Sequence, residues 1–457
     1  QNITWTSGYD GAATSPITLS NYWIFKYQNL TPDYSNWGAV GENGTLQPAQ
    51  GFTMKGTGAA SASQNYTFVG KPNNGTITST IAPGNLNLCG NPYPSAIDAD
   101  AFIAANSTVT TGTIYFWEHY NTNTSHNLLD YQGGYAARNL VGGTPPVSPT
   151  GISGSGTSSR IPSRFIPVGQ GFLVFGSGTG GAITFSNDQR GFVKENQETS
   201  NSLFRQNNQD LSIVDKQYDN HEDRIATTNT FSKIRLGFNS SNNYHRQILL
   251  GFMNEFATDG FDPGYDASQL DIQPNDLYFA IPGRNLVIQG VGAFTTSKIL
   301  PLSLKNGAAG NVQFTLDATE NFDENQNIYI HDNVTNEYHD IKNNPFEINL
   351  PIGTFDARFS LRFSNASLGI DDFNLSEEVI VTFTNNNNVI NINNNLSDAT
   401  IKSVELFNII GQSIQSWKVK NTDQTKIQIP LNNFSSGAYI VKVNTSKGDL
   451  SKKIIIK

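Results

Sequence analysis

The 457-residue sequence is poor in cysteine, in charged residues and in long apolar runs. Its single cysteine, Cys89, excludes an intramolecular disulfide. It contains no run of about 18 apolar residues, so it predicts no membrane-spanning helix. Charged residues make up 15% and aromatic residues 11%, and Gly, Asn, Thr and Ser are plentiful. This mixture favours strands and turns over helices.

Residues that could carry chemistry form no familiar catalytic or metal motif. The six histidines include no HExxH and no other close metal spacing. Gly154-Ser155-Gly156 lacks the strand and helix that a nucleophile elbow needs. We expect Cys89 to be a small buried residue. The sequence therefore predicts no catalytic residue, no zinc site and no enzyme, and Glu118 is the best remaining candidate for a glycosidase-like carboxylate.

A calcium site is the one metal site that the sequence leaves open. Asp259, Asp262 and Asp266 cluster in DGFDPGYD, and oxygen ligands at such spacing could hold calcium. The segment lacks the EF-hand order and its closing Glu, and Pro263-Gly264 favours a turn in which the Asp side chains bond to the backbone. We expect the turn, with calcium as the alternative, and no other cofactor.

Charge is distributed unevenly along the chain. Residues 379–457 contain nine Lys and four acidic residues, which give +5, whereas the whole chain carries −9. The preceding body is therefore strongly acidic, which argues against a nucleic-acid partner. A basic module on an acidic body indicates that the two parts meet different partners.

Composition and turn signals predict three β-rich parts and two connections. We expect a β-rich region at 1–191, a linker at 192–223, a β-sandwich at 224–365, a second linker at 366–378 and a small module at 379–457. The first residue is Gln1, and no signal-peptide pattern follows it, so we expect either a removed signal peptide or a piece of a longer chain.

The first region contains two similar halves. In each, an aromatic strand leads to a Pro, Gln-Gly-Phe turn and then to a short Thr-Phe strand. The shared positions are Pro48 and Pro167, Gln50 and Gln170, Gly51 and Gly171, and Phe52 and Phe172. Between the halves, Ser95 followed by Asp98 is a capping-box pattern, which predicts one short helix at 95–105.

Alternating apolar residues predict the strands of the second region. The expected strands are 233–239, 246–252, 277–282, 285–291, 312–318, 328–333, 346–351 and 357–363. The whole chain is therefore expected to be all-β: tandem antiparallel, jelly-roll-like sandwiches followed by a seven-stranded Ig-like sandwich.

The last module carries three sequence blocks in a fixed order. The first, VELFNIIGQSI at 404–414, is a strand that ends in a Gly411 turn. The second, IPLNNFSSGAYIVKV at 429–443, turns at Gly437 into another strand. The third, GDLSKKIIIK, ends the sequence. This pattern resembles the type A C-terminal sorting domain of the type IX secretion system of Bacteroidota.

The resemblance implies a set of sorting residues. These residues are Phe407, Asn408, Gly411, Gly437, Tyr439, Val441, Val443, Lys452, Lys453, Ile454, Ile455, Ile456 and Lys457. One departure from the usual pattern is that its Leu-Pro-x-Gly turn is replaced here by Phe434-Ser435-Ser436-Gly437.

The resemblance also implies partners and a destination. Such cargo passes through the periplasm and crosses the outer membrane through a translocon barrel. A shuttle barrel engages the sorting domain, and a cell-surface sortase removes it. The remainder is then released or anchored to lipopolysaccharide.

The function of the body is open between two classes. We expect a secreted or cell-surface, adhesin-like protein whose β regions bind glycans or act as spacers. An extracellular carbohydrate-active enzyme or other hydrolase is the alternative.

Overall fold

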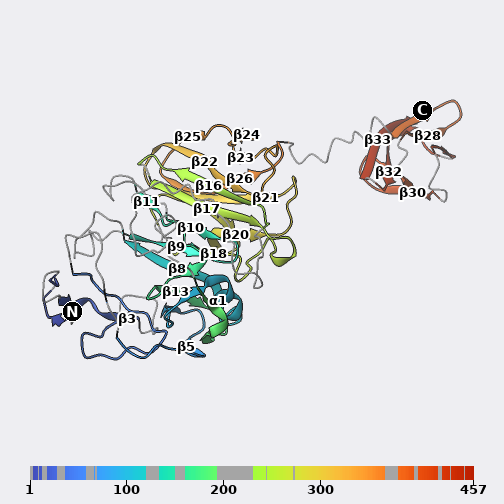
Figure 1. The fold of residues 1–457 in the computed structure, drawn as a ribbon. Helices are drawn as coiled ribbons and strands as arrows, with labels where there is room; N and C mark the ends of the chain where they lie inside the picture. Colours follow the sequence, from blue (N-terminus) through green and yellow to red (C-terminus); the bar gives the residue numbers. More distant parts are fainter. Residues whose placement is uncertain are drawn as a thin grey trace. The chain divides into compact units, whose positions relative to one another are not determined.

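The computed structural model resolves the chain into two compact units, Gln1–Asn365 and Ala366–Lys457. The residues that it describes are 4–8, 10–12, 18–27, 36–57, 66, 69–119, 133–149, 160–192, 230–242, 244–270, 273–365, 379–395, 400–419, 425–432, 434–446 and 448–456. The chain is all-β and multidomain, as expected, with one α-helix in this described part (Figure 1). The two expected linkers fall almost wholly outside it.

The first unit begins with small sheets. Strands β1 (Thr4–Thr6) and β2 (Thr18–Ser20) pair in parallel, and β3 (Phe25–Tyr27) pairs with β4 (Trp37–Ala39). Further small sheets join β5 (Ile77–Ile81) to β14 (Gly181–Phe185), and β12 (Phe165–Ile166) and β15 (Arg190–Gly191) to β7 (Ala96–Asp98). Short 3-10 turns lie at Asn21–Trp23, Asn187–Gln189 and Asn254–Phe256.

A five-stranded sheet supports this part. Its order is β10-β9-β8-β13-β6. The strands are β10 (Gly143–Thr144), β9 (Gly133–Arg138), β8 (Thr110–His119), β13 (Gly171–Gly176) and β6 (Leu86–Gly90).

The helix begins later than the sequence predicted. Helix α1 spans Ala99–Ala105. The side chain of Asp98 caps it by accepting hydrogen bonds from the backbone N–H groups of Asp100 and Ala101. Ser95 instead accepts a hydrogen bond from Arg190 Nε at 2.9 Å. Because residues 96–98 are held as strand β7 between two partners, helical backbone cannot start at residue 95.

The two Gln-Gly-Phe segments form the same turn. Gln50 N donates to Gln47 O at 3.0 Å, and Gln170 N donates to Pro167 O at 3.2 Å. The residue before each Gln has a positive φ, 68° at Ala49 and 74° at Gly169. Pro48 lies two residues before its Gln and Pro167 three residues before its Gln, so the two segments differ only in the first half of the turn.

Both segments then pair with strand β6. Cys89 faces Phe172 on one edge and bridges to Gln50 on the other. The two related segments thus lie on either side of one strand. In the third segment of the first half, at 65–70, the Thr67 and Phe68 pair lies outside the described residues.

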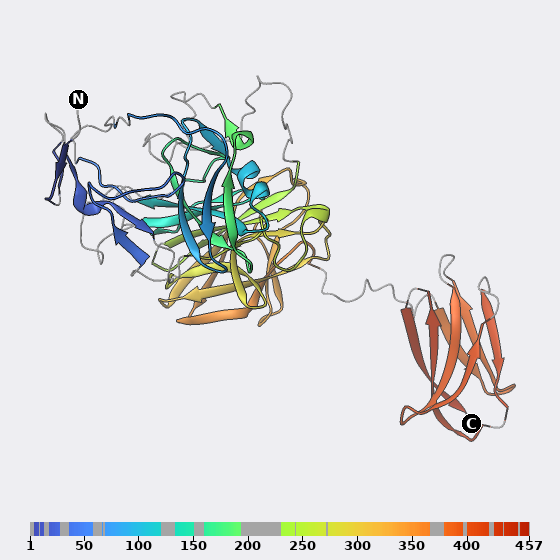
Figure 2. The same cartoon turned by 90° about the horizontal axis from the view of Figure 1, so that it is seen from below.

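A larger sheet forms the rest of the first unit (Figures 1 and 2). Its main path runs β24-β23-β26-β21-β19-β20-β17-β16-β22-β25. The strands are β16 (Lys233–Asn239), β17 (Tyr244–Phe252), β19 (Asp276–Ile281), β20 (Arg284–Val291), β21 (Ile299–Asn306), β22 (Gly310–Glu320), β23 (Tyr329–Asp332), β24 (Glu337–Asp340), β25 (Phe346–Leu350) and β26 (Gly353–Arg362). Two short strands, β11 (Ser148–Pro149) and β18 (Ala267–Ser268), join it from the side.

The large sheet folds over on itself. Phe314 on β22 and Phe359 on β26 are far apart in strand order, yet their ring centroids are 5.0 Å apart. Phe252 on β17 and Phe363, just after β26, are likewise 5.6 Å apart. The inward side chains therefore form one core between two layers, as in a sandwich. Its β17–β20 pair is parallel.

All eight expected strands occur within this sheet, and the structure adds β21, β24 and the short strands β11 and β18. Strand β21 alternates buried Leu300, Leu302 and Leu304 with other residues, but Pro301 lies in its middle. Proline is rare inside interior strands because it cannot donate to the ladder. Here the pairing of β21 with its neighbour β26 shifts register just after the proline, between Leu302 and Leu304.

The two parts of the first unit are joined at β8. Gly264 N donates to Thr111 O at 3.0 Å, and Thr113 Oγ1 donates to Asp266 O at 2.9 Å. Tyr115 belongs to the core of the large sheet although it lies on the five-stranded one. These contacts place 1–365 in one unit. The finer boundary between 1–191 and 224–365 stays a prediction.

The second unit is a seven-stranded sandwich, as predicted. One sheet contains β27 (Val379–Thr384), β28 (Val389–Asn394) and β31 (Lys426–Pro430). The other contains β30 (Ser413–Lys418), β29 (Ile401–Asn408), β32 (Gly437–Thr445) and β33 (Gly448–Ile456) in that order. The described residues of its core all belong to this unit.

We expect Gly112→Ala to destabilise the first unit more than Gly84→Ala does. Both glycines have a positive φ, 75° and 66°, so each alanine incurs a conformational cost of about 1–2 kcal/mol. A Cβ at Gly112 would lie 2.4 Å from Gly264 backbone atoms, whereas one at Gly84 meets nothing within 4 Å. The clash adds roughly 1–3 kcal/mol. Urea unfolding of both variants checks this, and equal losses would contradict the close approach.

Candidate functional site

The three sorting blocks meet at one end of the four-stranded sheet of the second unit. Asn408, at the end of β29, faces Tyr439 on β32. Tyr439 in turn faces Ile454 on β33. Asn408 and Tyr439 are about thirty positions apart in the sequence, and Tyr439 and Ile454 are about fifteen apart. The three residues nevertheless lie side by side on three neighbouring strands.

The first block forms a tight hairpin that is held by one side chain. Asn408 Oδ1 accepts from the backbone N–H groups of Ile410 at 3.2 Å and Gln412 at 2.9 Å. Asn408 Nδ2 donates to Gln412 Oε1 at 2.9 Å. Gly411 has a φ of 84°, a conformation that favours glycine. The predicted role of Gly411 in the turn is therefore confirmed.

The second block packs its aromatic ring beside the chain that leads into β32. Tyr439 Oη donates to Ser435 O at 3.0 Å, and its ring lies edge-on to Phe434 with centroids 6.2 Å apart. Gly437 was expected to allow a tight turn. Instead it is the first residue of β32, has no positive φ, and would place a Cβ only in ordinary contact with Tyr439.

The predicted sorting residues divide into core and surface. Val441, Val443, Ile454 and Ile456 are buried and form part of the unit's own core. Ile455, between two of them, is 57% exposed. Lys452 and Lys453 are exposed, Phe407 is half-buried, and Lys457 lies outside the described residues.

Sequence reasoning missed an apolar surface at this sheet end. Ile409 and Ile410 in the hairpin turn are 69% and 74% exposed, and Ile414 just beyond it is 46% exposed. We group these three with Ile455, which lies near the same end of the sheet but on the opposite edge strand β33, and call the four residues the isoleucine surface. Two adjacent isoleucines in a turn, where polar residues are usual, were the signal that could have revealed it.

The three aspartates that could have held calcium do not converge. Asp259 forms an ion pair with Lys298 at 2.6 Å. Asp262 Oδ2 accepts from Thr258 N at 2.6 Å, and Asp266 Oδ2 accepts from Asp262 N at 2.6 Å. Asp262 and Asp266 thus accept from backbone N–H groups, as expected for the turn, whereas the partner of Asp259 is a lysine side chain. No cluster of three metal-binding side chains is found within the described ranges, and the calcium alternative stays untested.

Asp266 is fully buried where the large sheet meets β8. Its other oxygen accepts from Gly290 N at 2.9 Å. Burial raises the pKa of Asp266 to about 7 and outweighs the two backbone N–H donors, which favour the charged form.

The raised pKa of Asp266 predicts a pH dependence. The folded state holds this proton more tightly than the unfolded state does. The resulting stability is present below about pH 4 and is lost as pH rises toward 7, by up to about 1.4 kcal/mol per pH unit. Urea unfolding across this range should show that decline, and Asp266→Asn should remove it. Asp259→Asn, at an exposed carboxylate, is the control that keeps it.

Other residues that the sequence singled out lie apart from these. Burial raises the pKa of the Cys89 thiol to about 12, so a thiolate nucleophile does not form there at neutral pH. Glu118 Oε1 lies 3.6 Å from Arg160 Nε. A role of Glu118 as a catalytic carboxylate is not tested.

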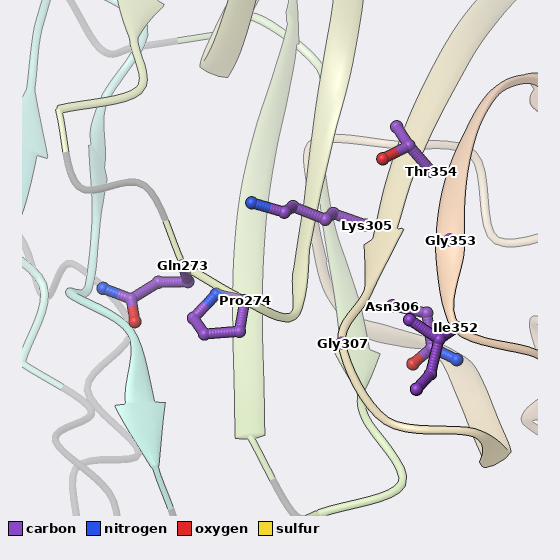
Figure 3. Close-up of a pocket in the computed structure, with 8 residues that line it drawn as sticks. All are labelled: Gln273, Pro274, Lys305, Asn306, Gly307, Ile352, Gly353 and Thr354. Carbon is purple, nitrogen blue, oxygen red and sulfur yellow. The ribbon is translucent and has the colours of Figure 1, made fainter.

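One open pocket lies in the large sheet (Figure 3). Its volume is about 410 Å³, and it is lined by Gln273, Pro274, Lys305, Asn306, Gly307, Ile352, Gly353 and Thr354. Lys305 points across it toward the side of Gln273 and Pro274. Among the described residues that line it, only Lys305 is charged, so these residues by themselves offer no acid–base pair.

Comparisons with known families cover most of the chain. A family model described as a domain of unknown function, DUF8693, matches residues 3–363. A model of the secretion system C-terminal sorting domain matches residues 385–457. The comparison with curated proteins finds no match. No helix among the described residues is both long and apolar enough for a membrane crossing.

A solved structure is similar to part of the chain. It is PorZ, an essential bacterial surface component of the type-IX secretion system of Porphyromonas gingivalis. The two are 13% identical with a TM-score of 0.15 over 40% of this chain and 25% of PorZ. The match thus spans a quarter of that protein's length.

Proposed function

We propose that this chain is a cell-surface binding protein whose sorting domain docks through the isoleucine surface. The chain belongs to the DUF8693 family and is a type IX secretion cargo. The sorting domain directs export to the cell surface or secretion and interacts with the type IX machinery. The finer proposal is that its partners are a translocon barrel, a shuttle barrel and a sortase.

The exposed isoleucines support docking at this sheet end. A fully buried isoleucine side chain contributes roughly 1.5–3 kcal/mol. Four of them, at 46% to 74% exposure, offer apolar area that a partner can cover. Ile409 and Ile410 lie in a turn that Asn408 holds through hydrogen bonds to the backbone, so little conformational entropy is lost when these two are covered.

The separate cores support removal of the sorting domain by a sortase. Among the described residues, those in the core of the second unit all lie between 379 and 456. Those in the cores of the first unit all lie at or before 363. Cleavage between the units would therefore leave a folded body, which could be released or anchored to lipopolysaccharide. We propose an adhesin-like role for that body.

Deleting 437–457 should leave the protein in the periplasm, but this removes β32 and β33 and with them part of the core. A sharper test is the double variant Ile409→Ser, Ile410→Ser, which changes only exposed side chains. We expect it to accumulate in the periplasm while the sorting domain stays folded. Surface protease digestion and fractionation of cells with a type IX system measure this.

The matched control is Val334→Ser, which removes an apolar side chain that is 72% exposed on the first unit. It should reach the cell surface normally. Normal surface amounts of the double variant would show that the isoleucine surface is not the docking site.

A further inference from the structure

Asp317 lies at an irregularity of the large sheet. Along the β16–β22 pair, Arg235 faces Ala318 and the next residue, Leu236, faces Leu316. Asp317 is therefore an extra residue without a partner, which is a β-bulge. Bulges of this kind re-aim a side chain and are over-represented next to functional sites.

A glycine lets the re-aimed side chain cross the neighbouring strand. A Cβ on Gly237 would lie 2.2 Å from Asp317 Oδ1 and 2.2 Å from Thr315 Oγ1. The carboxylate of Asp317 thus lies over Gly237 of β16 and reaches β17. There its Oδ2 accepts from Gln247 Nε2 at 2.8 Å and lies 3.2 Å from His245 Nε2.

The contacts continue along the same sheet face on both sides. Asn239 Oδ1 lies 2.8 Å from His245 Nδ1, and Asn239 Nδ2 donates to Gln313 Oε1 at 3.3 Å. Gln313 Nε2 donates to Glu347 Oε1 at 2.7 Å. We call Arg235, Asn239, His245, Gln247, Gln313 and Asp317 the polar row.

The charges of the polar row are compensated locally. Arg235 Nη2 lies 3.0 Å from Glu320 Oε1. Burial alone would raise the pKa of Asp317, but hydrogen bonds and charge from His245, with hydrogen bonds from Gln247 and Thr315, lower it below its ordinary value. The row therefore carries little net charge at neutral pH and presents amide, imidazole and carboxylate groups in alternation.

Two features of the polar row reduce stability. A bulge interrupts the ladder, and glycine inside a strand costs roughly 0.5–1 kcal/mol relative to alanine. Both occur where Asp317 crosses β16. Departures from local rules that coincide at one place are expected at functional sites.

We propose that the polar row binds a neutral saccharide. Sugar hydroxyls both donate and accept, which matches planar side chains that alternate donors and acceptors across strands about 4.8 Å apart. An anion would need net positive charge, and a cation would need a cluster of ligands. The side chains remain accessible, since those of His245 and Asp317 are 29% and 17% exposed. This inference rests on the proposed binding role of the body.

The test is binding of the full chain to an array of neutral hexose and N-acetylhexosamine oligosaccharides, with sialylated and sulfated ones for comparison. We expect binding of neutral members. Asp317→Ala and Gln313→Ala should each weaken it about tenfold or more. Asp259→Ala is the matched control, because it also removes a paired carboxylate and lies outside the row.

The outcomes separate this inference from the proposed function. Neutral saccharide binding that survives both row variants would overturn the polar row but keep the binding role. Binding of charged members alone would overturn the neutral ligand. Absence of any saccharide binding would overturn the inference, while the export test of the isoleucine surface would stand by itself. Gln313→Ala keeps the test decisive if Asp317→Ala fails to fold, because it leaves the bulge intact.

Discussion

The first unit depends on one close approach between two backbones. Gly112 of β8 and Gly264 of the loop before β18 lie so near each other that a Cβ on Gly112 would fall 2.4 Å from Gly264. This contact lets Thr111 O accept from Gly264 N and brings Thr113 to Asp266. Buried polar groups must be paired, and here each part supplies the other's partners. The five-stranded sheet and the large sheet are thereby held as one body.

The last strand of the sorting domain carries both buried and exposed isoleucines. This strand, β33, alternates between buried Ile454 and Ile456 and exposed Ile455. Because successive side chains of a strand point to opposite faces, one segment serves both the core and the surface. Ile454 and Ile456 therefore belong to the core of the unit, whereas Ile455 is part of the surface through which we propose that it docks. This explains why an apolar terminus is held in the sheet through its last described residue.

The polar row shows how a sheet builds a site without a deep pocket. Asp317 reaches two strands away only because the bulge turns it and Gly237 leaves room. Neither residue suggests this role in the sequence, where Asp317 belongs to an acidic stretch with Glu320. A register shift depends on both paired strands, so it cannot be read from one strand alone.

The sequence by itself determined the fold class, the export route and most strand positions. Alternation and turn residues predict strands locally, and the sorting blocks are close to a linear pattern, so both are visible without coordinates. The helix start was misplaced, because the pairing of residues 96–98 as β7 overrides the capping pattern at Ser95. Only the tertiary structure decided which isoleucines are exposed and which polar residues meet. Those properties depend on contacts between strands distant in the chain, which local residue patterns do not encode.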